Sequence, residues 1–268
     1  TMADLLRLLG LQPNLPVLNI LLPVGISFYT FQTMSYTIDV YLKKLSPTWD
    51  FWDFALFHAF FPQLVAGPIE RAVSLLPQIQ QPRVVTYDQV SRGAFLILWG
   101  LFKKIVIADG VAGAVETVYG MTTAQPTAMD IILASYLFTL QIYCDFSGYS
   151  DVARGTAKLM GFELVTNFNL PLLATSPRDF WQRWHMSLVT WLRDYLYIPL
   201  GGSRQGEWKT LRNIMITIFL SGFWHGAAWN FILWGIYQGI LVCLNHLWFM
   251  LKHITPPKAS VQRVLTVK

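Results

Sequence analysis

Residues 214–251 have the sequence IMITIFLSGFWHGAAWNFILWGIYQGILVCLNHLWFML, which contains no Asp, Glu, Lys or Arg. A helix needs roughly 20 apolar residues to cross about 30 Å of hydrocarbon. The segment is therefore long enough for two crossings, and we expect one membrane helix over 214–229 and a second over 231–251. This pair of helices predicts an integral membrane protein.

The composition of the whole chain supports the same fold class. Of 268 residues, 54% are hydrophobic and only 13% are charged, about half the charged share of an ordinary soluble domain. The 18 Phe, 11 Trp and 11 Tyr suit helices that end at two membrane–water interfaces. A soluble protein would leave too little polar sequence to cover so large a core. We therefore predict an all-α, polytopic transmembrane helical bundle.

Four further apolar segments are candidate membrane helices, and two of them contain helix breakers. In the first, Pro16, Pro23 and Gly25 break or kink the helix. The second ends at Pro62 and is too short for a clean span, so a broken or re-entrant helix is expected. The four segments cover residues 15–42, 51–66, 93–119 and 129–149.

The basic residues predict the orientation in the membrane. The net charge of +5 is spread in short groups between apolar segments, a pattern of membrane orientation and not of nucleic-acid binding. The loop 120–128 lacks Lys and Arg and is placed outside, so Arg83 and Arg92 lie on the cytoplasmic side. Lys103 and Lys104 fall within an apolar segment, where they must snorkel, face protein or line a wet cavity.

The stretch 144–199 is too polar for a membrane span and too aromatic for an ordinary loop. Ser176 and Pro177 are typical of a helix start, and we expect one helix from there that carries an Asp179–Arg183 pair. Its other members would be Trp181, Trp184, His185, Leu188, Trp191 and Leu192. Asp145 and Asp151 are expected to pair with Arg154, Arg183 or Arg193, although a catalytic role for these aspartates stays open.

The hexapeptide SGFWHG, residues 221–226, places His225 inside an apolar segment. An ionisable group at membrane depth is costly, and histidine acts as acid or base near neutral pH. Gly222 and Gly226 lie four residues apart and permit close approach of another backbone or a substrate. The structural alternative is a histidine that bonds a carbonyl of a neighbouring helix.

Three more histidines are weaker candidates. His185 either anchors an interfacial helix or takes part in catalysis, and His58 either packs in an apolar run or faces the same cavity. His246 lies near the end of the last helix, where snorkelling to the interface explains it. Two distant cysteines give no metal spacing, and the sequence has no phosphate loop, GxSxG, HExxH or CxxC motif, so no metal and no bound cofactor are expected.

Five ordered motifs resemble segments of the membrane-bound O-acyltransferase family, and the resemblance covers residues 22–248. Within the family, YCDFSGYSD and YLYIPLGG are most similar to the alginate O-acetyltransferase subgroup. Gln182 stands where those acetyltransferases usually have Arg, which puts one charge contact in doubt. The motifs are FPQLVAGPI (61–69), YCDFSGYSD (143–151), NFNLP (167–171), DFWQRWHMSLVTWLRDYLYIPLGG (179–202) and FWHG (223–226).

The resemblance implies a mechanism and a cellular setting. It implies that His225 is catalytic and that His185 lies beside the same intramembrane tunnel. Acetyl-CoA or another acyl thioester would be the cosubstrate, and an exported polysaccharide such as alginate would receive the acyl group with the help of extracytoplasmic acetyltransferase partner proteins. The protein would be a multi-pass protein of the bacterial inner membrane, in contact with membrane lipid and not with nucleic acid.

The resemblance also implies that residues 1–268 are one domain that lacks membrane helices at both ends. Other activities stay open at this point. Within the family they are transfer of D-alanine or of another acyl group to a cell-envelope polymer. Outside it they are a transporter of acyl donor or polymer, for which inverted repeats are expected and none is seen, and a catalytically inactive scaffold.

Overall fold

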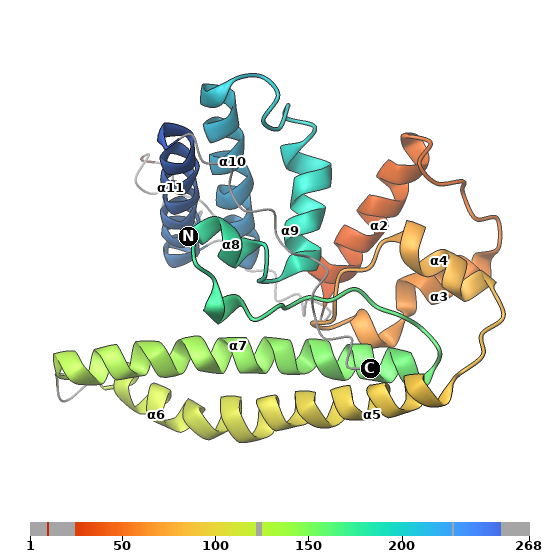
Figure 1. Ribbon diagram of the computed structural model, residues 1–268, viewed down its shortest axis with the longest axis horizontal. Helices are drawn as coiled ribbons and strands as arrows, with labels where there is room; N and C mark the ends of the chain where they lie inside the picture. Colours follow the sequence, from red (N-terminus) through yellow and green to blue (C-terminus); the bar gives the residue numbers. More distant parts are fainter. Residues whose placement is uncertain (1–9, 11–24, 122–124, 227, 253–268) are drawn as a thin grey trace. The chain divides into compact units, whose positions relative to one another are not determined.

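The computed structural model describes residue 10 and residues 25–121, 125–226 and 228–252, and these residues form helices and connecting segments without a strand (Figure 1). The all-α prediction is therefore confirmed for the described residues. The chain divides into two compact units: the first unit is Pro23–Phe168, and the second unit includes Asn169–Lys268. The expectation of one domain over 1–268 stays a prediction.

The helices of each unit follow one another with short connections. The first unit contains α2 (Ile26–Tyr41), α3 (Phe51–Ala59), η1 (Phe61–Gln63), α4 (Ala72–Gln80), α5 (Tyr87–Leu101), the π-helical η2 (Phe102–Ala108), α6 (Asp109–Tyr119) and α7 (Ala128–Leu159). The second unit contains η3 (Pro171–Leu173), α8 (Pro177–Trp181), α9 (Met186–Leu192), the π-helical η4 (Arg193–Tyr197), α10 (Glu207–His225) and α11 (Trp229–Leu251).

Two helices of the described chain, α7 and α11, are long and apolar enough to cross a membrane. Helix α11 matches the expected span 231–251 closely, whereas α10 begins earlier than expected, at Glu207. Residues 15–24 of the first expected span lie outside the described residues. Helix α7 corrects the prediction that the chain leaves its helix near Tyr149, because it continues through the polar residues to Leu159.

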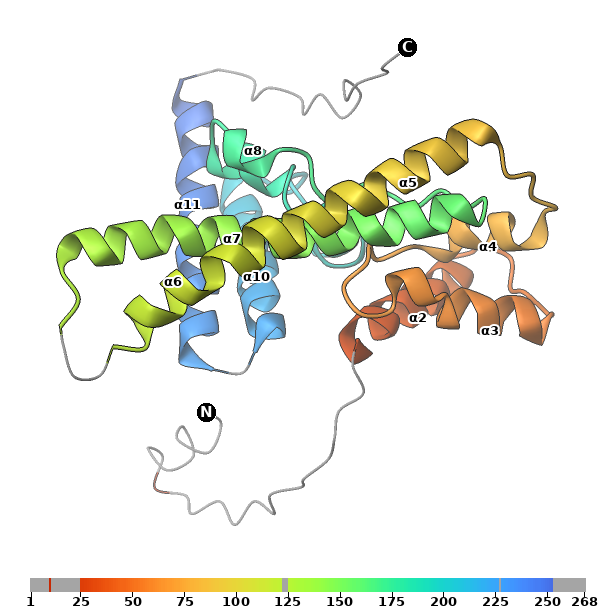
Figure 2. The ribbon, with the colours of Figure 1, turned by 90° about the horizontal axis from the view of Figure 1, so that it is seen from below.

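The helices α5, η2 and α6 run antiparallel to α7 (Figures 1 and 2). Gly93 lies against Gly155 and Gly100 lies against Gly148, so a step of seven residues along one helix matches a step of seven back along the other. A Cβ atom at Gly148 would lie 2.7 Å from the carbonyl oxygen of Gly100. Glycine is therefore required for the two backbones to approach this closely.

Ion pairs stabilise the charges within this hairpin. The Lys103 ammonium donates to Asp151 at 2.8 Å and to Ser147 at 2.9 Å, and its side chain is 8% exposed. Lys104 bridges Asp109 and Asp145 at 2.8 and 2.7 Å. Lys103 therefore faces protein, whereas Lys104 is paired with two carboxylates but its side chain is 46% exposed. The prediction that the aspartates are paired is confirmed, with Lys103 and Lys104 as partners that the sequence analysis missed; of the predicted arginines, Arg154 lies 3.6 Å from Asp151.

The broken helix over residues 51–66 is confirmed, since α3 ends at Ala59 and η1 follows at Phe61. The side-chain amides of Gln32 and Gln63 donate to the Phe57 carbonyl oxygen, at 2.6 and 3.1 Å. These bonds satisfy a carbonyl that the end of α3 leaves without a helical partner. The FPQLVAGPI motif is thus a structural turn in the first unit.

Next to that turn, a carboxyl group lies in the interior of the first unit. Glu70 is 1% exposed, and its Oε1 accepts a hydrogen bond of 2.5 Å from the Val165 amide. Burial raises the pKa of Glu70 to about 7, against the smaller opposing effects of this hydrogen bond and of Arg154 and Arg71. The apolar core of the unit packs beside it: Phe57, Phe60, Ala72, Leu75, Leu76, Ala157, Phe162 and Leu164.

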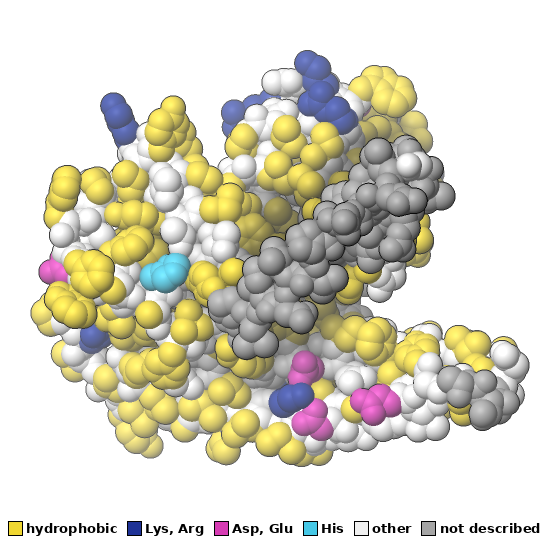
Figure 3. Space-filling view, turned by 180° about the vertical axis from the view of Figure 1, so that it is seen from behind, with side chains coloured by type: hydrophobic (Ala, Val, Ile, Leu, Met, Phe, Trp, Pro, Cys, Tyr) yellow, Lys and Arg dark blue, Asp and Glu magenta, His cyan; other side chains and the backbone are white. Residues whose placement is uncertain are grey.

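Hydrophobic side chains cover most of the face shown in Figure 3, and charged side chains gather in a few places on it. Large side chains that are more than two-fifths exposed on α7 include Met129, Ile132, Leu133 and Tyr136. An exposed apolar surface of this extent is expected of a protein whose helices face lipid.

We expect Gly148→Ala to destabilise the protein by roughly 1–3 kcal/mol, because the added methyl group overpacks the contact between α7 and α5. Gly113→Ala is the matched control, since a Cβ atom at Gly113 on α6 would have no neighbour within 4 Å. The measurement is the thermal unfolding midpoint of the intact protein in detergent. Equal midpoints for the two variants would contradict the close packing at Gly148.

We expect the pH dependence of stability to change in Glu70→Gln. Between the ordinary carboxyl pKa of 4.5 and the native value of about 7, the folded protein holds a proton that the unfolded chain has lost. Stability therefore falls as pH rises through this window, by up to about 3 kcal/mol. The glutamine variant should lose this dependence, so that it unfolds at higher temperature than the wild type at pH 8. A difference from wild type that is the same at pH 5 and pH 8 would refute the assignment.

Candidate functional site

Helices α10 and α11 of the second unit form an antiparallel pair that places His225. At one end of the pair, His246 Nε2 on α11 lies 2.8 Å from Glu207 Oε2 on α10. Toward the other end, a Cβ atom at Gly222 would lie 2.7 Å from the Cα atom of Gly235. The expectation that Gly222 permits another backbone to approach is therefore confirmed, with α11 as the neighbour. His225 is the last residue of α10, at the end of the pair where the chain turns into α11.

Aromatic rings surround the His225 imidazole and fix its orientation. Trp224 lies 4.8 Å away between ring centroids, Trp234 contacts the ring edge-on at 5.4 Å, and Phe231 stacks at 6.2 Å. Gly226 is required here, because a Cβ atom would lie 2.7 Å from the Phe231 ring. His225 nevertheless remains exposed on one side. It is thus a held imidazole that a substrate can reach.

The expected long helix after Ser176 is broken, which corrects the prediction. Ser176 caps α8 by accepting from the Asp179 amide, and Pro177 occupies the first turn, as predicted. The Asp179–Arg183 pair is confirmed at 2.7 Å. Helix α8 nevertheless ends at Trp181, and the chain turns before α9 begins at Met186.

His185 lies in that turn and immediately precedes α9. Its backbone is left-handed, with φ 46° and ψ 49°, a region that non-glycine residues rarely adopt. Its side chain is 2% exposed, and its ring lies 6.2 Å from that of Trp224. Trp224 therefore contacts both candidate histidines. Burial, and to a smaller extent the nearby His225 ring, lowers the pKa of His185 to about 3, so that this imidazole is neutral at physiological pH.

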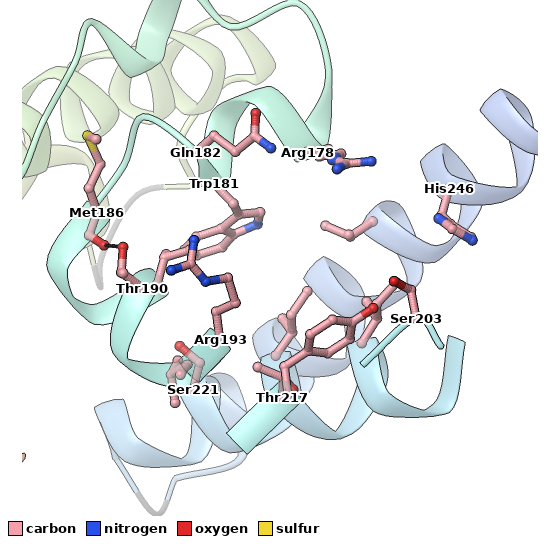
Figure 4. A pocket seen from close by; sticks show the side chains of 16 residues that line it. Arg178, Trp181, Gln182, Met186, Thr190, Arg193, Ser203, Thr217, Ser221 and His246 are labelled. Atoms are coloured by element: carbon pink, nitrogen blue, oxygen red, sulfur yellow. Dashed lines mark hydrogen bonds between the residues drawn. The ribbon is translucent and has the colours of Figure 1, made fainter. Parts of the chain in front are cut away.

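A cavity of about 680 Å³ lies in the same unit (Figure 4). This volume is within the range of sites for small molecules and cofactors. Four of its residues on α10 follow helical spacing and so share one face of that helix. The lining consists of Arg178, Trp181, Gln182, Met186, Val189, Thr190, Leu192, Arg193, Tyr197, Ser203, Ile214, Thr217, Ile218, Ser221, Val242 and His246.

The cavity follows α10 toward the two histidines. Its last residue on α10 is Ser221, which precedes His225 by one helical turn, and Met186 of its lining directly follows His185. Trp181 of the lining packs edge-on against Trp234, which in turn packs edge-on against His225. Neither imidazole is part of the lining itself. Trp181 and Trp234 thus connect the cavity lining to the His225 ring.

Two other histidines are placed differently from one another. His58 lies in the first unit, where its Nδ1 is 3.0 Å from the Thr33 hydroxyl, which favours the packing interpretation. His246 lines the cavity and contacts the exposed Glu207, and its snorkelling to an interface stays a prediction. The sequence analysis missed Arg178 and Ser221 as cavity residues. The sequence showed that both residues belong to helical segments, but it did not show that the chain between α8 and α10 brings them to the same cavity.

Comparisons with known proteins agree with the motifs. A sequence model described as MBOAT, membrane-bound O-acyltransferase family, matches residues 31–267. The chain is 44% identical over 236 residues to the protein named "Probable alginate O-acetylase AlgI" of Azotobacter vinelandii, covering 88% of this chain and 46% of that relative. It is 36% identical to the peptidoglycan O-acetyltransferase of Helicobacter pylori, covering 92% of this chain and 52% of the relative.

A relative of lower identity carries a different transferase name. The teichoic acid D-alanyltransferase of Bacillus subtilis is 31% identical, with 87% of this chain and 62% of the relative covered. The chain spans about half the length of the alginate relatives that it matches.

We expect His185→Asn to reduce the loss of stability at acid pH. The native ring stays neutral down to about pH 3, whereas in the unfolded chain it binds a proton below about pH 6.5. Stability is therefore lost as pH falls through this window, by about 2 kcal/mol at pH 5. Asn tolerates the left-handed backbone and does not titrate. The test compares thermal midpoints at pH 7 and pH 5, with His58→Asn as the control, and an unchanged acid loss in His185→Asn would refute the buried neutral state.

Proposed function

Because the chain belongs to the membrane-bound O-acyltransferase family, we propose that it is an acyltransferase. The acyl group that it transfers is proposed to be acetyl, which passes from a thioester donor to hydroxyl groups of an exported polysaccharide. One observation carries the proposal: a cavity of about 680 Å³ follows one face of α10 and ends one turn before the exposed imidazole of His225. Such a cavity provides room for a donor beside a group able to move a proton.

His225 is proposed as the general base. Its imidazole takes the proton of the attacking hydroxyl, and the hydroxyl oxygen bonds to the carbonyl carbon of the thioester. The tetrahedral intermediate then collapses as the carbon–sulfur bond breaks, and the thiolate receives the proton from the imidazolium. These reaction steps require no metal and no bound cofactor. The acyl thioester, which is acetyl-CoA or another thioester, is a cosubstrate.

His185 is proposed to position His225 rather than to contact the substrate. His185 is buried and neutral, and the ring of Trp224 contacts both His185 and His225. A rigid, neutral ring behind Trp224 keeps the His225 ring in place without placing a second charge beside the imidazolium that forms during the reaction. This refines the expectation that both histidines act in one tunnel.

The charge distribution supports entry of the donor from the cytoplasm. At the end of the α10–α11 pair opposite His225, the described residues include Arg204, Lys209, Arg212 and Lys252. Basic residues favour the cytoplasmic side. From Glu207 to His225 is about 27 Å of helix, close to the thickness of the hydrocarbon layer. We propose a multi-pass protein of the bacterial inner membrane with a tunnel that joins a cytoplasmic donor to an acceptor on the opposite side.

The names of the relatives guide the choice of acyl group and acceptor. An alginate O-acetylase and a peptidoglycan O-acetyltransferase match at higher identity than a teichoic acid D-alanyltransferase. Acetyl transfer to a cell-envelope polysaccharide, alginate first, is therefore proposed over D-alanyl transfer. Extracytoplasmic acetyltransferase partners are proposed to carry the acetyl group onward to the polymer, while membrane lipid surrounds the helices.

We expect His225→Ala in the intact protein to abolish O-acetylation of the exported polysaccharide, because the base is lost, while the amount of protein in the membrane stays normal. A loss of at least about 100-fold is expected from the contribution of general base catalysis. The measurement is the acetate released from the purified polymer by mild alkali, with membrane abundance followed by immunoblot.

His58→Gln is the matched control for loss of a histidine, and it should retain acetylation, since His58 lies in the first unit and bonds Thr33. Retained acetylation in His225→Ala would refute the assignment of the base. A second assay distinguishes an enzyme from a transporter. The purified wild-type protein should transfer acetyl from a thioester to a soluble alcohol, whereas a transporter would not.

A further inference from the structure

The hydroxyl groups that line the cavity have partners in the protein, with one exception. Thr190 and Thr217 each donate to the carbonyl oxygen four residues earlier, at 2.6 and 2.7 Å. Tyr197 and Ser203 are hydrogen-bonded to each other. The hydroxyl of Ser221 has no hydrogen-bond partner among the residues that the structure describes, although Ser221 belongs to the same lining (Figure 4).

A hydroxyl group in this state is costly to the fold. A serine in an apolar helix can donate to the carbonyl oxygen four residues earlier, as Thr217 does on the same helix. Ser221 does not make this bond, and it is only 6% exposed, so little bulk water reaches it. A buried hydroxyl without a partner costs about 1–3 kcal/mol. The O–H donor of Ser221 is therefore available to a ligand in the cavity.

The position of Ser221 relates this donor to His225. The two residues lie four apart on α10, so their side chains share one face of the helix, with Cβ atoms about 5–6 Å apart. Ser221 is the last lining residue of the cavity on α10, whereas His225 is exposed and lies outside the lining. A thioester at this end of the cavity can contact Ser221 while an acceptor hydroxyl reaches His225 from its exposed side.

We infer that Ser221 is a catalytic residue that donates a hydrogen bond to the carbonyl oxygen of the donor thioester. The inference rests on the proposed function and adds to it the group that stabilises the tetrahedral intermediate. As the acceptor oxygen bonds to the carbonyl carbon and its proton moves to His225, one electron pair of the carbonyl bond moves to the carbonyl oxygen. Ser221 keeps its own proton, and its hydrogen bond to the negatively charged oxygen becomes stronger. The carbonyl bond then forms again, the carbon–sulfur bond breaks, and the thiolate takes the proton from His225.

Two other roles for Ser221 are less compatible with the geometry. A nucleophilic serine needs a base within hydrogen-bond reach, and a serine that positions His225 needs a bond to the imidazole. No hydrogen bond joins Ser221 to His225 in the described part of the chain. Both alternatives also predict different experimental results from those of a hydrogen-bond donor to the substrate.

The test measures steady-state acetyl transfer from acetyl-CoA to a water-soluble methyl glycoside by the purified intact protein. Ser221→Ala should lower kcat by about 100-fold, the loss expected for one oxyanion donor, and change KM for either substrate by about twofold at most. The thermal unfolding midpoint of this variant should equal or exceed that of the wild type, because the change removes a buried hydroxyl without a partner and alanine favours helices. A structural role would instead lower activity and stability together.

Two further variants make the test specific. Ser221→Thr retains a hydroxyl group and should keep kcat within about tenfold of the wild type. Thr210→Val removes another buried hydroxyl of α10, one that lies outside the cavity lining and donates to the Gly206 carbonyl, and it should keep the wild-type kcat. In Ser221→Ala the pH dependence of kcat/KM should keep its shape, because His225 remains the base.

A wild-type kcat in Ser221→Ala would overturn the inference. An acetyl group on Ser221, detected by peptide mass spectrometry after the protein is mixed with acetyl-CoA alone, would also overturn it, since serine would then be the nucleophile. A shifted pH profile in Ser221→Ala would do the same in favour of a role in positioning His225. In each of these cases an inactive His225→Ala leaves the proposed function standing, so that the inference alone fails. If His225→Ala retains acetylation, the proposed function fails whatever Ser221→Ala shows.

Discussion

The close approach of α10 and α11 at Gly222 and Gly235 is the constraint on which the candidate site depends. A Cβ atom at Gly222 would meet both the Gly235 Cα atom and the Phe231 carbonyl oxygen at 2.7 Å, so only glycine permits the spacing. Phe231 and Trp234 belong to the first turns of α11, and they reach His225 only because the two backbones are this close. The orientation of the imidazole is therefore a consequence of small residues elsewhere on the helices.

The first unit combines the same close packing with paired charges. Gly100 and Gly148 bring α5 against α7, and this closeness lets Lys103 reach Asp151. An unpaired charge in an apolar helix is costly, whereas a paired and hydrogen-bonded charge is tolerated. Lys103 and Lys104 are consecutive residues of the π-helical segment η2, and both reach carboxylates. The wider turn of a π-helix departs from regular α-helical spacing. The polar half of α7 is thus compatible with a helix because its charges have partners.

The sequence predicted the elements that depend on local patterns and missed those that depend on contacts between helices. Apolar length predicted α11, proline and glycine predicted the break after α3, and Ser176 with Pro177 predicted the start of α8. The left-handed turn at His185 was missed, because aromatic and apolar residues continue through it at helical spacing and neither Gly nor Pro marks the break. Its cause is tertiary: the turn buries the imidazole beside Trp224, which belongs to a distant part of the sequence.

That turn gives the two histidines different properties. Both neighbour Trp224, but His225 is exposed at the end of a helix, whereas His185 is buried with a pKa lowered to about 3. A single proton acceptor beside a neutral ring suits a reaction in which one proton moves from a hydroxyl to a thiolate, since a second imidazolium would repel the charged form of the first. The cavity adds direction to this arrangement, because its lining on α10 ends at Ser221, one turn before His225.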